Sequence, residues 1–418
     1  PWDSVSPQLA QAHGNVFTVW VGPTPMVVLS GFWMVKEALV SNSEQFSGRP
    51  LTPLFRDVFG ERGKAALSAG NGRHFCLATL RELGLGKLAL ELQLQGEAAE
   101  LAEAFHREQG RPFDPRVHIV TSTARVIGAL AFGHHFLLED PFFQELIQAI
   151  DFGLAFVSTI WRRLYDLLPW AFRRLPGPHQ EMFRYQKAAT DDPVSTFNEE
   201  NLIQVVVDLF LGGTDTTATT LCWALICVVQ HGAIQEPPAE RVQRELDADR
   251  EVLPYTRTVH EVQHLSSVVT ADAVRQCVTS THVHGHPMPK GTIILSNLAS
   301  VFYDPECWET PNNSTLATSW TRMETSWSVR PSCHSLQVLD TALGHEWALV
   351  CLGDQLARME LFLMFATLLR TFWFQLPEGS PGLRREYIFG GTRQPRPQEI
   401  CTVPRLNCPN PGPGEEGV

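Results

Sequence analysis

The spacing of apolar side chains predicts a mostly helical protein with a small amount of sheet. Apolar positions recur at helical spacing over residues 90–107 and 143–158, which are therefore predicted to be amphipathic helices. A shorter helix is predicted over residues 33–41, and the apolar run after Gly353 predicts a long buried helix. Residues 165–179 are interrupted by prolines, so we expect a loop there.

Two parts of the chain have the composition of strands. Residues 16–22 and 25–31 are apolar and β-branched and are joined by a Gly-Pro-Thr-Pro turn, which predicts a β-hairpin. Residues 253–269 predict another helix. Residues 271–311 then predict a strand, a hairpin, a second strand and a loop.

The longest predicted helix covers residues 196–231. Thr196 and Glu199 have the spacing of a capping box, no proline interrupts the run, and Gly232 is placed to end it. We therefore expect one continuous helix that crosses the core.

The middle of this helix, residues 212–217, has the sequence GGTDTT. Each glycine costs a helix about 1 kcal/mol relative to alanine. Glycine permits the close approach of a flat group, and an acid and a hydroxyl on one turn can pass protons. We therefore expect Gly213 and Thr216 to face a central cavity. The alternative is a Gly-Thr kink for close helix packing. A phosphate-binding loop is excluded, because no lysine follows the glycines.

Histidines occur at two places where a ligand or an ion pair could form. His282, His284 and His286 alternate along a predicted strand and could share one face, as metal ligands would. No carboxylate or cysteine completes that set, so an ordinary strand surface is the favoured interpretation. Glu261 and His264 lie one turn apart on a predicted helix, where such a pair usually belongs to a solvated face.

Composition narrows the class of protein. The chain has 418 residues, of which 44% are hydrophobic and 19% charged, so it can bury a sizeable core. No linker or charge block divides it, and we treat residues 1–418 as a single domain. The net charge of −12 argues against nucleic acid as a partner. Nine cysteines without a Cys-x-x-Cys pair indicate reduced thiols.

Cys351 and Gly353 immediately precede the last long helix. A cysteine followed by glycine two residues later, at the start of a buried helix, is a suitable place for a thiolate to bind a metal. The residues just upstream supply neither a positive charge nor a glycine turn. The alternative for Cys351 is therefore a buried structural thiol.

Taken in order, these segments resemble a cytochrome P-450, a heme-thiolate monooxygenase of the microsomal, xenobiotic-oxidising family two. The resemblance is carried by residues 14–31, the GGTDTT helix, the Pro-Lys-Gly turn at 289–291, and the sequence CLGDQLAR at 351–358. It extends over nearly the whole chain and implies the cytochrome P-450 fold, mainly α with a small β region.

The resemblance also implies a cofactor and its ligands. Cys351 would be the axial ligand of heme iron, and its thiolate would favour O–O cleavage. Arg73 and Arg275 match positions whose side chains bind the heme propionates. Gly353 belongs to the loop whose amides stabilise the thiolate.

On the distal side, the resemblance gives each residue of the GGTDTT turn a role. Gly212 and Gly213 would let the porphyrin and O₂ lie against the helix backbone. Asp215 and Thr216 would deliver protons. The implied reaction inserts one oxygen atom from O₂ into a small apolar substrate, such as a xenobiotic, a fatty acid or a steroid. Electrons would come from NADPH through a flavoprotein reductase.

The resemblance implies an enzyme on the cytosolic face of the endoplasmic reticulum membrane. The chain begins at Pro1 without an initiator methionine, and no run of about 18 apolar residues is present. We therefore expect the N-terminal membrane anchor to be absent from this chain. Peripheral membrane contact is then expected from apolar surface loops.

Residues 312–347 match nothing in the family pattern, and we treat 312–350 as an aberrant segment. Residues 314–327 and 331–338 can be back-translated into codons and read from one base earlier. Both segments can then yield a family-like amino-acid sequence in the same reading frame. We infer a frameshift across this segment, with the family frame regained at Cys351. The alternative function follows from it: a catalytically inactive, heme-poor product of a decayed or mispredicted gene.

Two departures weaken the expected heme site. The family's Phe, Gly and Arg before the cysteine are replaced by Gly344, Trp347 and Leu349. The family's Glu-x-x-Arg pair becomes Glu261 with His264, and a buried acid that loses its partner costs about 3–5 kcal/mol. We therefore expect the unmodified chain to retain little heme.

Overall fold

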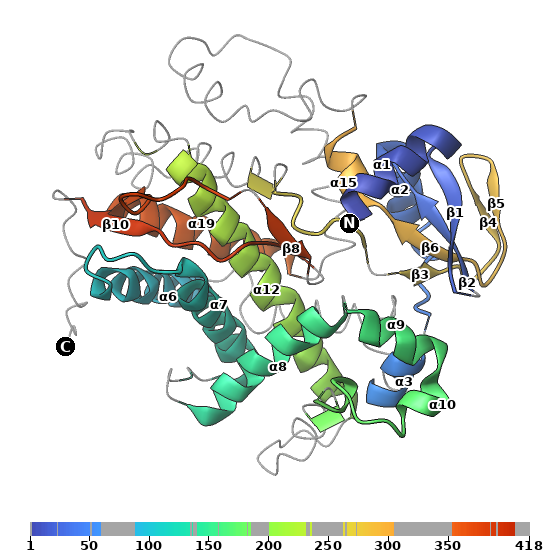
Figure 1. Cartoon of the computed structure of the whole chain (residues 1–418), viewed down its shortest axis with the longest axis horizontal. Helices are drawn as coiled ribbons and strands as arrows, with labels where there is room; N and C mark the ends of the chain where they lie inside the picture. Colours follow the sequence, from blue (N-terminus) through green and yellow to red (C-terminus); the bar gives the residue numbers. More distant parts are fainter. Residues whose placement is uncertain are drawn as a thin grey trace, which may run out of the picture.

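The protein was studied as a computed structural model. The structure describes residues 2–22, 24–50, 52–59, 88–133, 136, 140–157, 159–181, 183–184, 200–230, 235, 262–263, 266–272, 274–304, 353–384, 386–389 and 392–405. Helices dominate these residues, and the strands form small sheets (Figure 1). The prediction of a mainly α protein with a small β region is confirmed.

The N-terminal hairpin and two strands from residues 275–296 build a four-stranded sheet with the order β1-β2-β6-β3. Its strands are β1 (Val16–Val21), β2 (Thr24–Leu29), β6 (Ile293–Ser296) and β3 (Arg275–Gln276). β1 and β2 pair as the predicted antiparallel hairpin, and β6 joins β2 in parallel. The sheet packs its apolar side chains with those of helix α2 (Phe32–Lys36) in one buried cluster.

Four long helices form the larger core. They are α6 (Leu88–Arg107), α7 (Pro115–Phe132), α12 (Glu200–Gln230) and α19 (Asp354–Thr371). Their facing leucine, isoleucine, valine and phenylalanine side chains make the largest buried cluster, as their hydrophobic burial favours. Figure 1 shows α12 running obliquely across the molecule, with α7 and α19 beside it. The helices predicted from 90–107 and from the run after Gly353 are confirmed.

Helix α7 was not predicted, although its ends have ordinary signals. Asp114 precedes the helix, and its side chain accepts a hydrogen bond from the backbone N–H of Arg116. Pro115 occupies the first helical position, where a missing N–H has no consequence. Gly133 ends the helix with a left-handed φ of 74°.

The loop predicted at 165–179 is wrong over its first half. Helix α8 (Pro141–Val157) is followed by α9 (Ile160–Leu167) and α10 (Pro169–Phe172). Pro169 begins α10 instead of breaking a helix, because proline is tolerated in the first turn. The short helix α3 (Pro53–Phe59) packs against α9, where the carboxylate of Asp57 binds the Tyr165 hydroxyl at 2.8 Å.

The remaining elements are short. They are α1 (Trp2–His13), the π-helical turn Glu37–Ser41, β4 (Thr281–Val283), β5 (His286–Met288), α15 (Leu298–Phe302), β7 (Phe372–Gln375), β8 (Tyr387–Phe389), β9 (Arg393–Pro395) and β10 (Cys401–Pro404). β10 pairs with β7, and β9 with β8. Helix α15 lies where part of a loop was expected. In the described part of the chain, no helix is long and apolar enough to cross a membrane.

Candidate active site on helix α12

The candidate site lies on α12, which is continuous over its 31 residues. The prediction of an unbroken helix is confirmed within Glu200–Gln230, and its proposed capping residues lie outside the described part. The GGTDTT turn is therefore ordinary helix and does not break or unwind it.

Gly212 and Thr216 share one face of this helix. The Thr216 hydroxyl donates a hydrogen bond of 2.6 Å to the carbonyl oxygen of Gly212, one turn earlier. Gly212 is exposed, and a Cβ added to it would meet nothing within 4 Å. This face therefore offers open space, a bare stretch of backbone and a hydroxyl group.

Gly213 lies on a different face. A Cβ at Gly213 would come within 2.5 Å of Cδ1 and 3.0 Å of Cγ1 of Ile127 on α7. The expectation that Gly213 faces a cavity is wrong, because successive helical residues are rotated by about 100° and Gly212 takes the open face. The packing alternative thus holds for Gly213, whereas Gly212 retains the room for a flat group.

The two glycines are expected to respond differently to substitution. Gly212→Ala is expected to raise the free energy of unfolding by about 0.5–1 kcal/mol, because alanine favours helix and has room. Gly213→Val is expected to lower it by about 1–3 kcal/mol, because the added methyl groups overpack Ile127. Urea unfolding of both variants measures this. A gain in stability for Gly213→Val would contradict the assigned packing.

Asp215 is buried, and its carboxyl group points to β9. Only 2% of the residue is exposed. Thr392 donates its hydroxyl to Oδ2 at 2.6 Å, and the Gln394 amide donates to Oδ1 at 2.8 Å. Burial raises the pKa of Asp215 above its ordinary value, opposed by the Thr392 bond, the positive charge of Arg116 and the Gln394 bond. Asp215 therefore does not share the face of Thr216.

Arg116 connects this buried acid to the surface. Its Nη1 donates to Oε1 of Gln394 at 2.7 Å, and its Nη2 lies 3.9 Å from Oδ1 of Asp215. The same Nη2 lies 3.5 Å from the half-exposed carboxylate of Asp151 on α8. Local sequence gives no signal for this network, because α7, α8, α12 and β9 come from distant parts of the chain.

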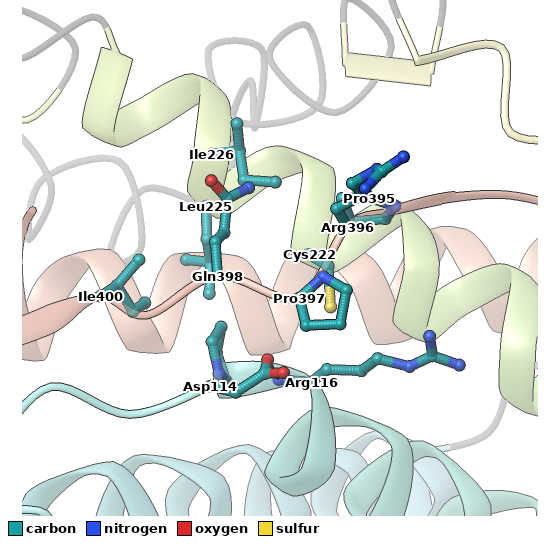
Figure 2. A pocket seen from close by; sticks show the side chains of 11 residues that line it. Asp114, Arg116, Cys222, Leu225, Ile226, Pro395, Arg396, Pro397, Gln398 and Ile400 are labelled. Atoms are coloured by element: carbon teal, nitrogen blue, oxygen red, sulfur yellow. Dashed lines mark hydrogen bonds between the residues drawn. The ribbon is translucent and has the colours of Figure 1, made fainter. Parts of the chain in front are cut away.

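A small pocket lies beside this network (Figure 2). Its walls come from the start of α7, from α12 and from the chain after β9: Asp114, Pro115, Arg116, Cys222, Leu225, Ile226, Pro395, Arg396, Pro397, Gln398 and Ile400. The guanidinium group of Arg116 extends away from the pocket (Figure 2). Burial raises the pKa of Cys222 to about 12, so its thiol stays protonated and is a poor ligand.

Cys277 and Cys401 are also buried thiols. Burial raises the pKa of Cys277 and of Cys401 above the ordinary thiol value. Cys277 donates to the carbonyl oxygen of Thr279 at 2.7 Å. Cys401 belongs to β10, where it pairs with Gln375 of β7. These cysteines serve the packing of sheets.

Arg275 and Gly353 are the remaining predicted site residues that the structure describes. Arg275 lies on β3 and is 8% exposed, and its Nε donates to the carboxylate of Asp272 at 2.6 Å. Gly353 is the residue before α19, with φ −98°, and has open space around it. Arg73 and Cys351 lie outside the described residues, as do Glu261, His264 and the segment 312–350.

The three histidines do not share a strand. His282 lies on β4 and His286 on β5, and the turn between the two strands contains His284. His284 has a φ of 47°, and its ring contacts the carboxylate of Glu37. The expectation of an alternating strand is wrong because the chain reverses at this turn. Among the described residues, no group of three or more side chains could hold a metal ion.

The described residues fit a flat prosthetic group beside α12. The open backbone at Gly212 is what a planar ring needs for close approach, and the Thr216 hydroxyl adjoins it. Cys351 is two residues before Gly353, at the start of α19, and α19 packs against α12. Cys351 itself lies outside the described residues.

Comparison with known proteins gives the family. A family model described as Cytochrome P450 matches residues 3–194, 185–314 and 349–402. Cytochrome P450 2J2 of Homo sapiens is 33% identical over 444 residues, which cover 94% of this chain and 85% of that protein. Cytochrome P450 2D6 of Homo sapiens is 33% identical over 455 residues, with 95% and 88% covered.

The chain belongs to the cytochrome P450 family of heme monooxygenases. These relatives are members of cytochrome P450 family two, as the sequence resemblance indicated. The family's cofactor is heme iron held by a cysteine thiolate. Residues 315–348 lie between the matched segments, within the aberrant segment 312–350.

Proposed function

We propose that this chain inserts one oxygen atom from O₂ into a small apolar organic substrate. The observation that supports the proposal is the open face of α12, where the bare backbone of Gly212 adjoins the Thr216 hydroxyl. In a chain of the P450 family, this face of an unbroken helix provides room for the heme and a hydroxyl group for proton transfer, which oxygen insertion requires.

The proposed cofactor contacts follow from the family positions. Cys351 would hold the heme iron, and Arg73 and Arg275 would bind the propionates. Arg275 already binds Asp272, so a propionate would share this guanidinium group. Heme held by a thiolate supplies activation of dioxygen, and the protein supplies orientation and protons.

We assign the proton chemistry to the acid and the hydroxyl of the GGTDTT turn. Thr216 presents its hydroxyl at the open face, where it can hold a proton near Gly212. Asp215 is the acid of the same turn, and burial favours its protonated form. Gly213 supports both by letting α12 approach α7 closely.

The proposed substrates are small apolar compounds such as xenobiotics, fatty acids or steroids. Electrons are proposed to come from NADPH through a flavoprotein reductase. Incubation of the heme-loaded chain, with residues 314–350 repaired, with a panel of these compounds, reductase, NADPH and ¹⁸O₂ tests the proposal: one labelled atom should appear in the product. Unlabelled products, or equal turnover by Cys351→Ala, would contradict it.

The proposed location is the cytosolic face of the endoplasmic reticulum membrane, with peripheral contact. Large apolar side chains are exposed around α9, α10 and the tip of the β1–β2 hairpin, namely Trp20, Val21, Ile160, Trp161, Leu167, Leu168 and Trp170. Gly22 of the hairpin lies against Leu167, so the two regions form one surface. The α9–α10 segment also carries arginines, a combination that favours an anionic lipid interface.

Replacing Trp170, which is 68% exposed, with serine is expected to weaken binding to anionic vesicles roughly tenfold. Val117→Ser on α7, where the side chain is similarly exposed, serves as the control and should leave vesicle binding unchanged. Vesicle co-sedimentation measures both. Moderate salt should release much of the bound protein, because screening weakens the arginine contacts. Equal binding by both variants would exclude this surface.

A further inference from the structure

The carboxyl group of Asp215 is enclosed by three side chains that belong to other elements. We call Thr392, Gln394 and Arg116 the Asp215 bracket. Thr392 and Gln394 occupy one carboxylate oxygen each, and Arg116 orients the Gln394 amide by binding its oxygen. Because Gln394 must accept from Arg116, its NH₂ group is left to face Asp215. The amide orientation is thus determined from α7.

The bracket opposes the effect of burial on the charge of Asp215. Burial alone favours the neutral acid, whereas hydrogen bonds donated to the carboxylate favour its ionised form. The charged groups that face Asp215 are Arg116 from α7 and, beyond it, Asp151 from α8. Thr392, just before β9, and Gln394 of β9 are neutral donors to this carboxyl group.

The bracket also determines the direction in which the Asp215 carboxyl group points. The Thr216 hydroxyl is bound to the Gly212 carbonyl, while the neighbouring carboxyl group is held toward β9. Neither group hydrogen bonds to the other in this arrangement. Before Asp215 could transfer a proton toward Thr216, its hydrogen bond with Gln394 or Thr392 would have to break.

We propose that Thr392, Gln394 and Arg116 are positioning residues for the proposed reaction, which restrain the Asp215 carboxyl group toward β9 and favour its ionised form. The role in catalysis rests on the proposed function. The bracket itself is a property of the protein without its cofactor and is tested there.

The test compares Thr392→Val, which removes the hydroxyl but keeps the shape, with Thr392→Ser, which keeps the hydroxyl. Melting temperatures are measured from about pH 4 to about pH 8. The folded pKa of Asp215 is raised, so its stabilising contribution is complete below the ordinary value of 3.8 and falls as pH rises through the folded pKa. The hydroxyl bond matters most once the carboxylate is charged.

The loss of melting temperature in Thr392→Val relative to Thr392→Ser should therefore grow with pH and become roughly twice as large at the upper end. In an Asp215→Asn background the difference should not depend on pH. A constant difference with Asp215 present would overturn the proposal. If Thr392→Val does not fold, Gln394→Met against the parent chain is judged by the same criterion.

Incorporation of ¹⁸O into product, measured separately, tests the proposed function independently of this result. In heme-loaded protein, Thr392→Val should also shift the pH profile of turnover upward, because losing a donor raises the pKa of the Asp215 carboxyl. An unmoved or downward-shifted profile would contradict the role in the reaction.

Discussion

Replacing residues 314–350 with in-frame family text, together with His264→Arg, is expected to tighten heme binding roughly 100-fold. The change restores an arginine at position 349, which can pair with a propionate, and an arginine partner for Glu261. Each charge-assisted contact contributes about 1.5–3 kcal/mol, and every 1.4 kcal/mol is about tenfold in affinity. A glycine at position 347 also lets the loop turn beside the cysteine. Titration with hemin, followed by Soret absorbance, measures the affinity.

The matched control carries the same segment with leucine retained at position 349. It should recover the turn but not the propionate contact. Its heme affinity should therefore lie between that of the unmodified chain and that of the repaired chain. If the unmodified chain binds heme as tightly as the repaired one, the segment 312–350 does not damage the site, and the heme-poor alternative falls with it.

The second large effect is expected at Arg125, in the core between α6, α7 and α19. Arg125 lies 3.4 Å from Glu97, whose side chain is 2% exposed. Glu360 on α19 is fully buried nearby, and its burial and the charge of Glu97 raise its pKa well above the ordinary value. With Glu360 neutral, Arg125, which also binds Glu100, is a cation that compensates the buried Glu97.

Arg125→Met is therefore expected to lower the free energy of unfolding by about 3–5 kcal/mol, because it leaves Glu97 buried without this partner. Adding Glu97→Gln should recover part of that loss. Arg107→Met, which removes an exposed helical pair with Glu103, should change stability by less than about 0.5 kcal/mol. Urea unfolding measures all three. A small effect for Arg125→Met would show that Glu97 is compensated by other groups.

Periodicity was sufficient to predict the long elements. The helix across the GGTDTT turn, the first hairpin and the helices near residues 90–107 and 143–158 could be predicted because each has a run of apolar residues with suitable end signals. The same patterns do not predict α9 and α10, because proline in a sequence favours a helix break, whereas Pro169 starts a helix here.

The candidate site could be predicted only in part. The motif identified the turn that carries Thr216, but which glycine lies open depends on Ile127 of another helix. The partners of Asp215 are 177 and 179 residues away, and hydrogen bonds of that kind leave no local pattern. The position of Cys351 before a buried helix indicated a metal ligand or a structural thiol, and the resemblance to the family implied the heme ligand, which stays a prediction.

The central claim is that Cys351 holds heme iron as a thiolate beside the open face of α12. The most direct measurement is the carbon monoxide difference spectrum of the reduced, heme-loaded chain with the repaired segment, compared with the same chain carrying Cys351→Ala. The account predicts a red-shifted Soret band with Cys351 and its loss in the alanine variant. A red-shifted band that survives Cys351→Ala, or an unshifted band with Cys351 present, would contradict it.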